Sequence, residues 1–187
     1  MVSPRVVLLL TLLFLFALGC QQIDPPRTEL TQNQWRQVQN HLLEEAPEPQ
    51  HPMGVIFDGN LMLLGFDLDG ELRPGGSATV TWYWQALEDI HKDWKIFVHL
   101  DSDVERLRQN LDRYPLAQSM NEIYRTYHLR EGHILADRQT FVLREDFPPG
   151  DATFFVGLFR GEPRAPATGG RTTEDHRGIG PTVEILP

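Results

Sequence analysis

The sequence predicts a mainly β protein, an antiparallel, immunoglobulin-like β-sandwich preceded by one short α-helix. Two observations indicate this fold class. Between residues 53 and 187 the apolar residues come in short runs, several of which alternate with polar residues, and turn dipeptides containing Gly, Pro or Asp separate the runs. No long stretch of helical periodicity lies between the runs, so the pattern favours a sandwich over βαβ units.

The helix is expected over residues 31–45. Thr31 opens a Thr-x-x-Gln pattern typical of a capping box, and apolar residues recur at helical spacing from Trp35 to Leu42. Two prolines then end the helix, because proline cannot continue the helical hydrogen bonds. They lie in a Pro-rich linker over residues 46–52.

The clearest strand is expected over residues 77–87. Val80, Trp82 and Trp84 alternate with Tyr83 and other polar residues, so the two tryptophans are predicted to face the core. Further strands are expected at residues 60–68, 94–101, 134–136, 139–143, 152–160 and 182–186.

Two segments between strands lack a clear pattern. In the strand over residues 94–101, Phe97 and His99 face outward because they alternate with inward apolar residues. Residues 102–132, which follow it, are charged and irregular. Residues 161–181 are rich in Gly, Pro, Thr and Arg without periodicity, which is typical of a disordered, edge-covering or functional loop.

The start of the chain has the layout of an export signal. After the basic residue Arg5, an apolar stretch runs from Val6 to Leu18, and the small residue Gly19 precedes Cys20, the only cysteine in the chain. This arrangement resembles the lipobox of bacterial lipoproteins. The resemblance implies that residues 1–19 are removed and that Cys20 carries a diacylglycerol on sulfur and an acyl chain on its new amino group.

The length of the apolar stretch distinguishes the alternatives for this segment. A membrane-spanning helix needs about 20 apolar residues, so the shorter stretch favours cleavage at Cys20 over an uncleaved anchor; an ordinary secretory signal is the third alternative. Two or more acyl chains hold a protein durably on a membrane. Gln21 follows the cysteine, and the resemblance to Gram-negative lipoproteins then implies the outer membrane of the cell envelope.

A second resemblance covers residues 57–160. The segments that carry it are, in order, Leu63-Leu64-Gly65-Phe66-Asp67-Leu68, Arg73-Pro74-Gly75-Gly76, Val80-Thr81-Trp82-Tyr83-Trp84, Phe97-Val98-His99-Leu100, Gly132-His133-Ile134-Leu135-Ala136-Asp137 and Phe155-Val156-Gly157-Leu158-Phe159. Together they resemble a bacterial extracytoplasmic β-sandwich domain of unknown function, found alone in lipoproteins and appended to membrane glycosyltransferases. The resemblance implies the fold, an envelope location and a neighbourhood in surface-polysaccharide biology. It supplies no catalytic residues.

These observations divide the chain into four segments. They are a lipoprotein signal peptide (1–19), a tether (20–30), a helix with a Pro-rich linker (31–52) and the β-sandwich domain (53–187).

Composition excludes one class of partner. The chain has 187 residues and a formal net charge of −9, and Lys92 and Lys95 are its only lysines. Binding to nucleic acid requires a basic surface that neutralises phosphates, so nucleic acid is excluded as a partner. The membrane itself is an expected partner, contacted through the lipid on Cys20, and an envelope protein or glycan is the other.

Motifs for catalysis or cofactor binding are missing from the sequence. It contains no HExxH, no GxSxG, no Walker-type loop and no dinucleotide fingerprint. His99 and Asp101 share a strand face, and His133 lies four residues before Asp137, but a zinc site needs three or four converging ligands. The sequence therefore predicts no catalytic residues, no metal and no cofactor.

Aromatic and basic residues give the candidate ligand-binding positions. Tyr83 and Phe97 are candidates for an exposed platform that stacks on sugar rings, with arginines to hydrogen-bond sugar hydroxyls. Arginines also make residues 161–181 locally basic on an acidic protein. The candidate residues are Tyr83, Phe97, His99, Arg125, Arg164 and Arg171.

The sequence thus predicts a lipid-anchored, non-catalytic envelope protein that recognises or scaffolds an envelope protein or glycan. One alternative is a carbohydrate-binding module that uses the exposed aromatics. The other is an enzyme acting on envelope glycans, which would require a cleft with two carboxylates.

Overall fold

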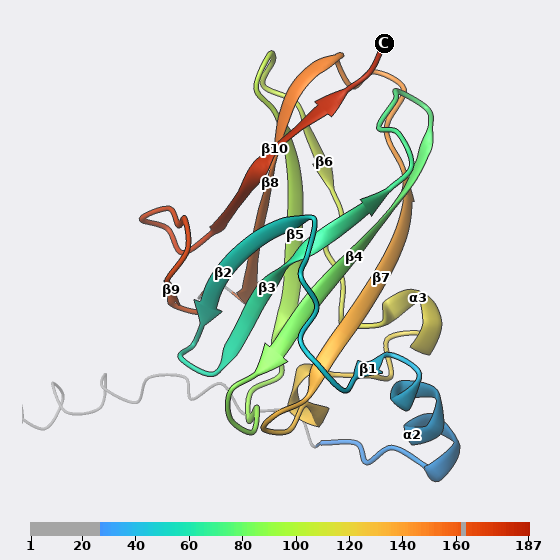
Figure 1. Cartoon of the computed structure of the whole chain (residues 1–187), viewed down its shortest axis with the longest axis vertical. Coiled ribbons are helices and arrows are strands. Elements are labelled where there is room, and N and C mark those ends of the chain that lie inside the picture. The colour runs from blue at the N-terminus through green and yellow to red at the C-terminus, as the bar shows by residue number, and fades with distance from the viewer. Residues whose placement is uncertain (1–26, 162–163) are drawn as a thin grey trace, which may run out of the picture.

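The protein is an antiparallel β-sandwich preceded by a short helix, as the sequence predicts (Figure 1). The computed structural model describes residues 27–161 and 164–187. The strand order is β1-β7-β4-β3-β2-β9 in the six-stranded sheet and β10-β8-β5-β6 in the four-stranded sheet. The strands are β1 (Leu42–Leu43), β2 (His51–Phe57), β3 (Leu61–Asp69), β4 (Ser77–Ala86), β5 (Lys95–Ser102), β6 (Arg108–Asn110), β7 (Ile134–Val142), β8 (Gly150–Phe159), β9 (Ala167–Thr168) and β10 (Gly178–Ile185).

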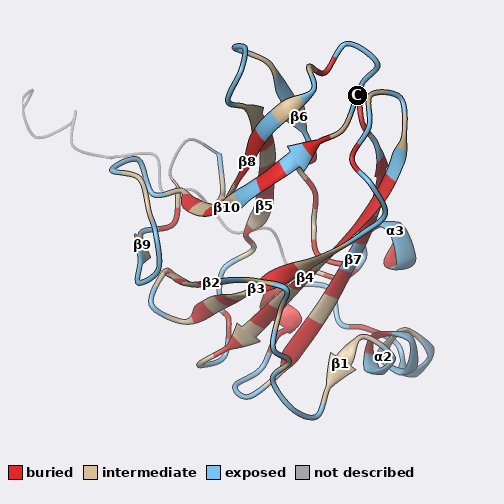
Figure 2. Cartoon of the chain, turned by 45° about the horizontal axis from the view of Figure 1, so that its top comes forward, coloured by how far each residue is buried: buried red, intermediate tan, exposed pale blue. Residues whose placement is uncertain are grey.

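The core lies between the two sheets. Figure 2 shows buried residues along β3, β4, β7 and β8. Trp82 and Trp84 are both buried, which confirms the alternation predicted for β4. The ring of Phe66 lies 4.8 Å from that of Trp82 and 5.2 Å from that of Phe154, so aromatic packing joins the two sheets.

Helix α2 (Gln32–Gln39) begins as predicted but ends earlier. Its capping box is confirmed, because the Gln34 N–H donates to Thr31 Oγ1 and the Thr31 N–H donates to Gln34 Oε1. Beyond Gln39, the chain forms β1, which pairs with the start of β7. This pairing with a distant strand replaces the last helical turn. None of the described helices combines the length and hydrophobicity needed to cross a membrane.

The segments predicted to be irregular contain short regular elements. Residues 102–132 hold β6, helix α3 (Ala117–Met120) and the 3-10 helix η1 (Thr126–His128). Strand β2 begins inside the predicted linker, at His51. Residues 161–181 hold β9, which pairs with β2, and the first residues of β10. These two strands attach the loop to both sheets.

A buried ion pair fixes the chain that follows β6. Arg113 Nη2 donates to Asp137 Oδ2 at 2.8 Å, and Arg113 Nη1 donates to Gln139 Oε1. The Leu116 N–H donates to the other oxygen of Asp137 at 2.9 Å. Because a buried charge needs hydrogen-bonded partners, this network ties the segment after β6 to β7. It thereby sets the position of Asp112, which reaches the candidate site.

Candidate functional site

The outer face of the four-stranded sheet carries a row of aromatic side chains. Alternation along β5 places Phe97 and His99 on this face, and β8 adds Phe155 and Phe159. Phe97 pairs with Gly157, where an added Cβ would lie 2.3 Å from the Phe97 ring. Gly157 is therefore the residue that lets the ring lie across the neighbouring strand.

Next to these rings the surface forms a depression of about 190 Å³. It is lined by Phe97, His99, Asp112, Phe159, Gly161 and Arg164. Three predicted candidates, Phe97, His99 and Arg164, thus come together at one place. Because small-molecule pockets are commonly about 300–1,000 Å³, a depression of this size suits a single ring-sized group.

Among the described residues that line the depression, Asp112 is the negative group. Its Oδ1 lies 3.3 Å from Nε2 of His99 and accepts from the Val98 N–H at 3.0 Å. Burial opposes ionisation of this carboxyl, but the hydrogen bonds from His99 and Val98 outweigh it and hold the pKa of Asp112 below its ordinary value. The carboxylate therefore stays ionised and accepts hydrogen bonds.

Cations lie over the aromatic rings of this face. Cζ of Arg164 is 5.1 Å from the centroid of the Phe97 ring, which is within the range of a cation–π contact. Three further pairs repeat the arrangement: Arg177 over Phe155 at 4.6 Å, Lys95 over Phe159 at 5.8 Å and Arg125 over Tyr114 at 3.6 Å. The same face also carries the carboxylates of Asp101 and Asp112, so cations and anions alternate over it.

The predicted exposed aromatic platform is wrong. Phe97 exposes only 3% of its surface, since Arg164 and neighbouring rings cover it. Tyr83 lies on the outer face of the six-stranded sheet, on the other side of the sandwich. Its hydroxyl donates to Asp67 Oδ2 at 2.8 Å, and burial together with this bond raises the pKa of Tyr83 to about 12. Tyr83 and Phe97 therefore cannot contact one ligand ring together.

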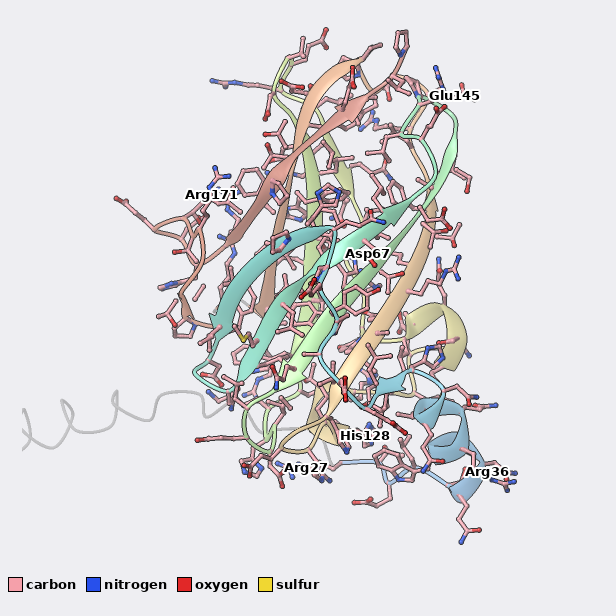
Figure 3. The ribbon with its side chains drawn as sticks, viewed as in Figure 1. Arg27, Arg36, Asp67, His128, Glu145 and Arg171 are labelled. Atoms are coloured by element: carbon pink, nitrogen blue, oxygen red, sulfur yellow. The ribbon has the colours of Figure 1, made fainter. Side chains whose placement is uncertain are left out.

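Two predicted arginines lie outside the depression. Arg125 stacks on Tyr114, with Nη1 3.7 Å from Asp93 Oδ2. Arg171 is exposed on the loop between β9 and β10 (Figure 3), where its carbonyl accepts from the Ile179 N–H at 2.8 Å. Cys20, the predicted lipidation site, lies outside the described residues.

Sequence reasoning missed Asp112 and Phe159. Phe159 ends a strand that is apolar on both faces, so its outward position gave no signal. Asp112 lies in a segment without periodicity, and its position depends on the buried Arg113–Asp137 pair. Only the pairing of β5 with β6 and β8 brings these residues together.

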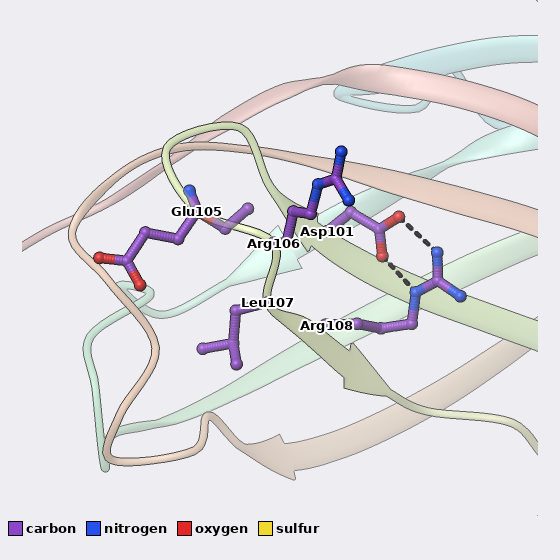
Figure 4. A pocket seen from close by; sticks show the side chains of 6 residues that line it. Asp101, Glu105, Arg106, Leu107 and Arg108 are labelled. Carbon is purple, nitrogen blue, oxygen red and sulfur yellow. Dashed lines mark hydrogen bonds and ion pairs between the residues drawn. The ribbon is translucent and has the colours of Figure 1, made fainter.

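A second depression, of about 370 Å³, lies at the hairpin between β5 and β6 (Figure 4). It is lined by Asp101, Ser102, Glu105, Arg106, Leu107 and Arg108. Arg108 donates to both oxygens of Asp101, at 2.6 and 2.7 Å, so these charges neutralise each other. No aromatic ring lines this depression, so it offers less to a ligand than the first. Across the described ranges, no three His, Cys, Asp or Glu side chains converge to hold a metal ion.

No family model and no curated protein match this chain. Among solved structures, it is similar to a Niemann-Pick type C2 protein from the Japanese carpenter ant, with 7% identity and a TM-score of 0.45 over 66% of this chain and 91% of the other. It is similar to the C-terminal domain of wzt, with 10% identity and a TM-score of 0.48 over 76% of this chain and 83% of that domain. A variant β-glucosidase from Listeria innocua in complex with laminaribiose has 18% identity and a TM-score of 0.35, with 89% of this chain covering 21% of that one. Similarities this low carry no information on function.

Proposed function

We propose that this protein is a non-catalytic, lipid-anchored protein of the cell envelope that recognises an envelope glycan. The observation that supports this proposal is the depression on the outer face of the four-stranded sheet. There Arg164, His99 and Asp112 surround a small space with aromatic walls.

The polar groups of the depression suit a sugar residue. A hydroxyl group both donates and accepts hydrogen bonds, so neighbouring hydroxyls can donate to the Asp112 carboxylate and accept from the Arg164 guanidinium. Phe159, which is partly exposed, offers apolar contact to the C–H groups of a sugar ring. The aromatic side chain therefore forms a wall of the depression and does not act as an exposed platform on which a sugar ring stacks.

A protein partner is less favoured by the surface. Stable protein interfaces have an apolar core, and exposed apolar patches often mark such sites. Among the described residues, the large hydrophobic side chains that are exposed are Val104 (60%), Ile123 (39%) and Val142 (60%). They lie in three separate segments, namely the β5–β6 hairpin, the residues after α3 and the end of β7.

The charge state of Asp112 supports a non-catalytic role. Hydrolysis of a glycosidic bond uses two carboxyl groups, one of which must be protonated to act as the general acid. Among the residues that the structure describes, one carboxyl group lines the depression, and its pKa is lowered. A group that stays ionised at neutral pH accepts hydrogen bonds but does not supply the proton.

The proposed anchor would raise the local concentration of the recognition domain. Acyl chains on Cys20 would confine the protein to the outer membrane surface, where its glycan ligand is also confined. The intact mass of the protein purified from membranes, beside a Cys20→Ala variant, tests this part. Acyl mass on the native protein in outer-membrane fractions is the expected result, and an unmodified Cys20 contradicts it.

A glycan array tests the recognition part. The protein purified from membranes in detergent is expected to bind a subset of glycans, and Arg164→Ala is expected to weaken that binding about tenfold or more, since a hydrogen bond to a charged group contributes about 1.5–3 kcal/mol. Arg138→Ala, on the opposite outer face, is the matched control and should bind as the native protein does. An array on which the native protein binds no glycan overturns the proposal.

A further inference from the structure

Two arginines lie side by side over the aromatic row of the four-stranded sheet. Arg164 covers Phe97 on β5, and Arg177 covers Phe155 on β8. Phe155 pairs with His99, two residues along β5 from Phe97, so the two rings are diagonal neighbours. The two guanidinium groups therefore stand next to each other on one continuous surface.

A single carboxylate holds this arginine pair. Asp175 Oδ2 accepts from Arg164 Nη1 at 2.5 Å, and Asp175 Oδ1 accepts from Arg177 Nε at 3.1 Å. Thr173 Oγ1 also donates to Asp175 Oδ1 at 2.5 Å. The hydrogen bond from Thr173 and those from the two arginines hold the pKa of Asp175 well below its usual range. The two arginines and Asp175 thus form a fixed cluster with a net charge of +1.

Toward the residues that the structure describes, both arginines keep unused hydrogen-bond donors. Asp175 engages Nη1 of Arg164 and Nε of Arg177. Nε and Nη2 of Arg164, and both terminal nitrogens of Arg177, have no hydrogen-bond partner within residues 27–161 and 164–187. The fork of a guanidinium group matches the two oxygens of a carboxylate. The cluster therefore offers two preorganised forks: that of Arg164, which lines the depression, and that of Arg177, which lies over Phe155.

We infer that the glycan is acidic and that its sugar carboxylates bind the free forks of Arg164 and Arg177, with Asp175 as the positioning residue. This inference rests on the proposed function and names the class of glycan: a polymer or oligosaccharide that contains uronic acids. The depression beside Arg164 holds the sugar ring, and Arg177 lies where the next unit of the chain would follow.

The overall charge of the protein is compatible with such a ligand. Its net charge of −9 repels polyanions at long range. At physiological ionic strength, however, charges separated by more than about 8 Å are largely screened. Binding then depends on the local cluster, so affinity for an acidic glycan should fall as salt concentration rises.

Calorimetric titration with matched polymers tests the inference. The protein in detergent is titrated with polygalacturonate and polyglucuronate, and with the same polymers after their carboxyl groups have been reduced to alcohols. We expect an acidic polymer to bind about tenfold or more tightly than its reduced form. Equal affinity for the two forms overturns the inference and leaves glycan recognition standing. No binding to any of the four polymers, together with a blank array, overturns both.

Substitutions show which residues give the protein its higher affinity for the acidic polymer. Arg164→Gln and Arg177→Gln should each weaken binding of the acidic polymer about tenfold and reduce its salt dependence, whereas the control Arg138→Gln should change neither. Asp175→Asn removes a negative charge, so attraction alone would tighten binding, whereas a positioning role requires weaker binding. Tighter binding by Asp175→Asn contradicts that role. Thermal midpoints equal to that of the native protein show that each variant is folded.

Discussion

His128 joins the N-terminal segment to the sandwich through both of its ring nitrogens. The Arg125 N–H donates to Nδ1 at 3.0 Å, and Nε2 donates to the Thr28 carbonyl at 2.7 Å. Figure 3 shows His128 and Arg27 near the same end of the molecule. This arrangement requires a neutral ring with its proton on Nε2, because a protonated Nδ1 cannot accept.

Acid is therefore expected to loosen this attachment. Burial lowers the pKa of His128 from its ordinary 6.5, and Arg130 lowers it further, while the Thr28 carbonyl, Glu29 and Asp93 act in the opposite direction. A lowered pKa means that the unfolded chain binds the proton more readily. The contribution to stability is then full above pH 6.5 and is lost as the pH falls toward the lower folded value.

Denaturant unfolding of the native protein at pH 7.5 and pH 5 measures this effect. The free energy of unfolding should fall with acidification, and the fall should be smaller in His128→Gln. Part of the fall should remain in this variant, because the pKa values of His51 and His133 are also lowered. His176→Gln, at an exposed position, is the control. An unchanged fall in His128→Gln would contradict the role given to this ring.

Asp137 is expected to be the most costly polar side chain to remove. Breaking a buried ion pair leaves an uncompensated charge, so Asp137→Ala should lower the free energy of unfolding by about 3–5 kcal/mol. Asp69→Ala is the control. The Asp69 side chain is 84% exposed and lies 3.7 Å from Arg138, which is 64% exposed, so the free energy of unfolding should fall by less than about 1 kcal/mol. Similar losses in the two variants would show that the buried network is not needed.

Among the elements, strand β7 has one edge that a side chain protects where no neighbouring strand does. Strand β1 covers only the start of β7. Farther along, Gln118 of α3 accepts from the Thr140 N–H at 2.8 Å and donates to the Thr140 carbonyl at 2.6 Å. The side-chain amide thus takes the place of a neighbouring strand. Open strand edges are sites of self-association, so this contact should keep the protein monomeric.

Sedimentation velocity of Gln118→Ala tests this contact. The variant should associate as its concentration rises, because the N–H and carbonyl of Thr140 become available to another chain. Gln37→Ala, on the exposed side of α2, should sediment as the native protein does. A monomeric Gln118→Ala variant at all concentrations would contradict the proposed protection.

Elements with a local signal could be predicted from the sequence. The alternation around Trp82 gave β4 and its inward face, and Thr31 gave the start of α2. The end of α2 could not be predicted, because Leu42 and Leu43 pair with residues more than ninety positions away. Likewise, Phe97 was correctly placed on an outer face, but its cover by Arg164 depends on how residues 164–177 fold back over the sheet.

At the scale of the whole molecule, the N-terminal segment and the C-terminus lie at opposite ends of the sandwich (Figure 1). Arg27 donates to the His91 carbonyl and Leu30 is buried, so the described chain enters the domain firmly at the end that holds α2 and η1. A membrane anchor on Cys20 would reach the sandwich from this end. The outer face of the four-stranded sheet, along the side of the molecule, would then be open to a glycan.

Mapping of a bound oligosaccharide by NMR chemical shifts tests the central claim most directly. A uronic-acid oligosaccharide is titrated into the isotope-labelled protein. Shifts are expected at Phe97, His99 and Arg164, on the outer face of the four-stranded sheet, and not at Tyr83, on the opposite face. Shifts confined to the Tyr83 face, or no shifts at any concentration, would contradict the assignment of the binding site.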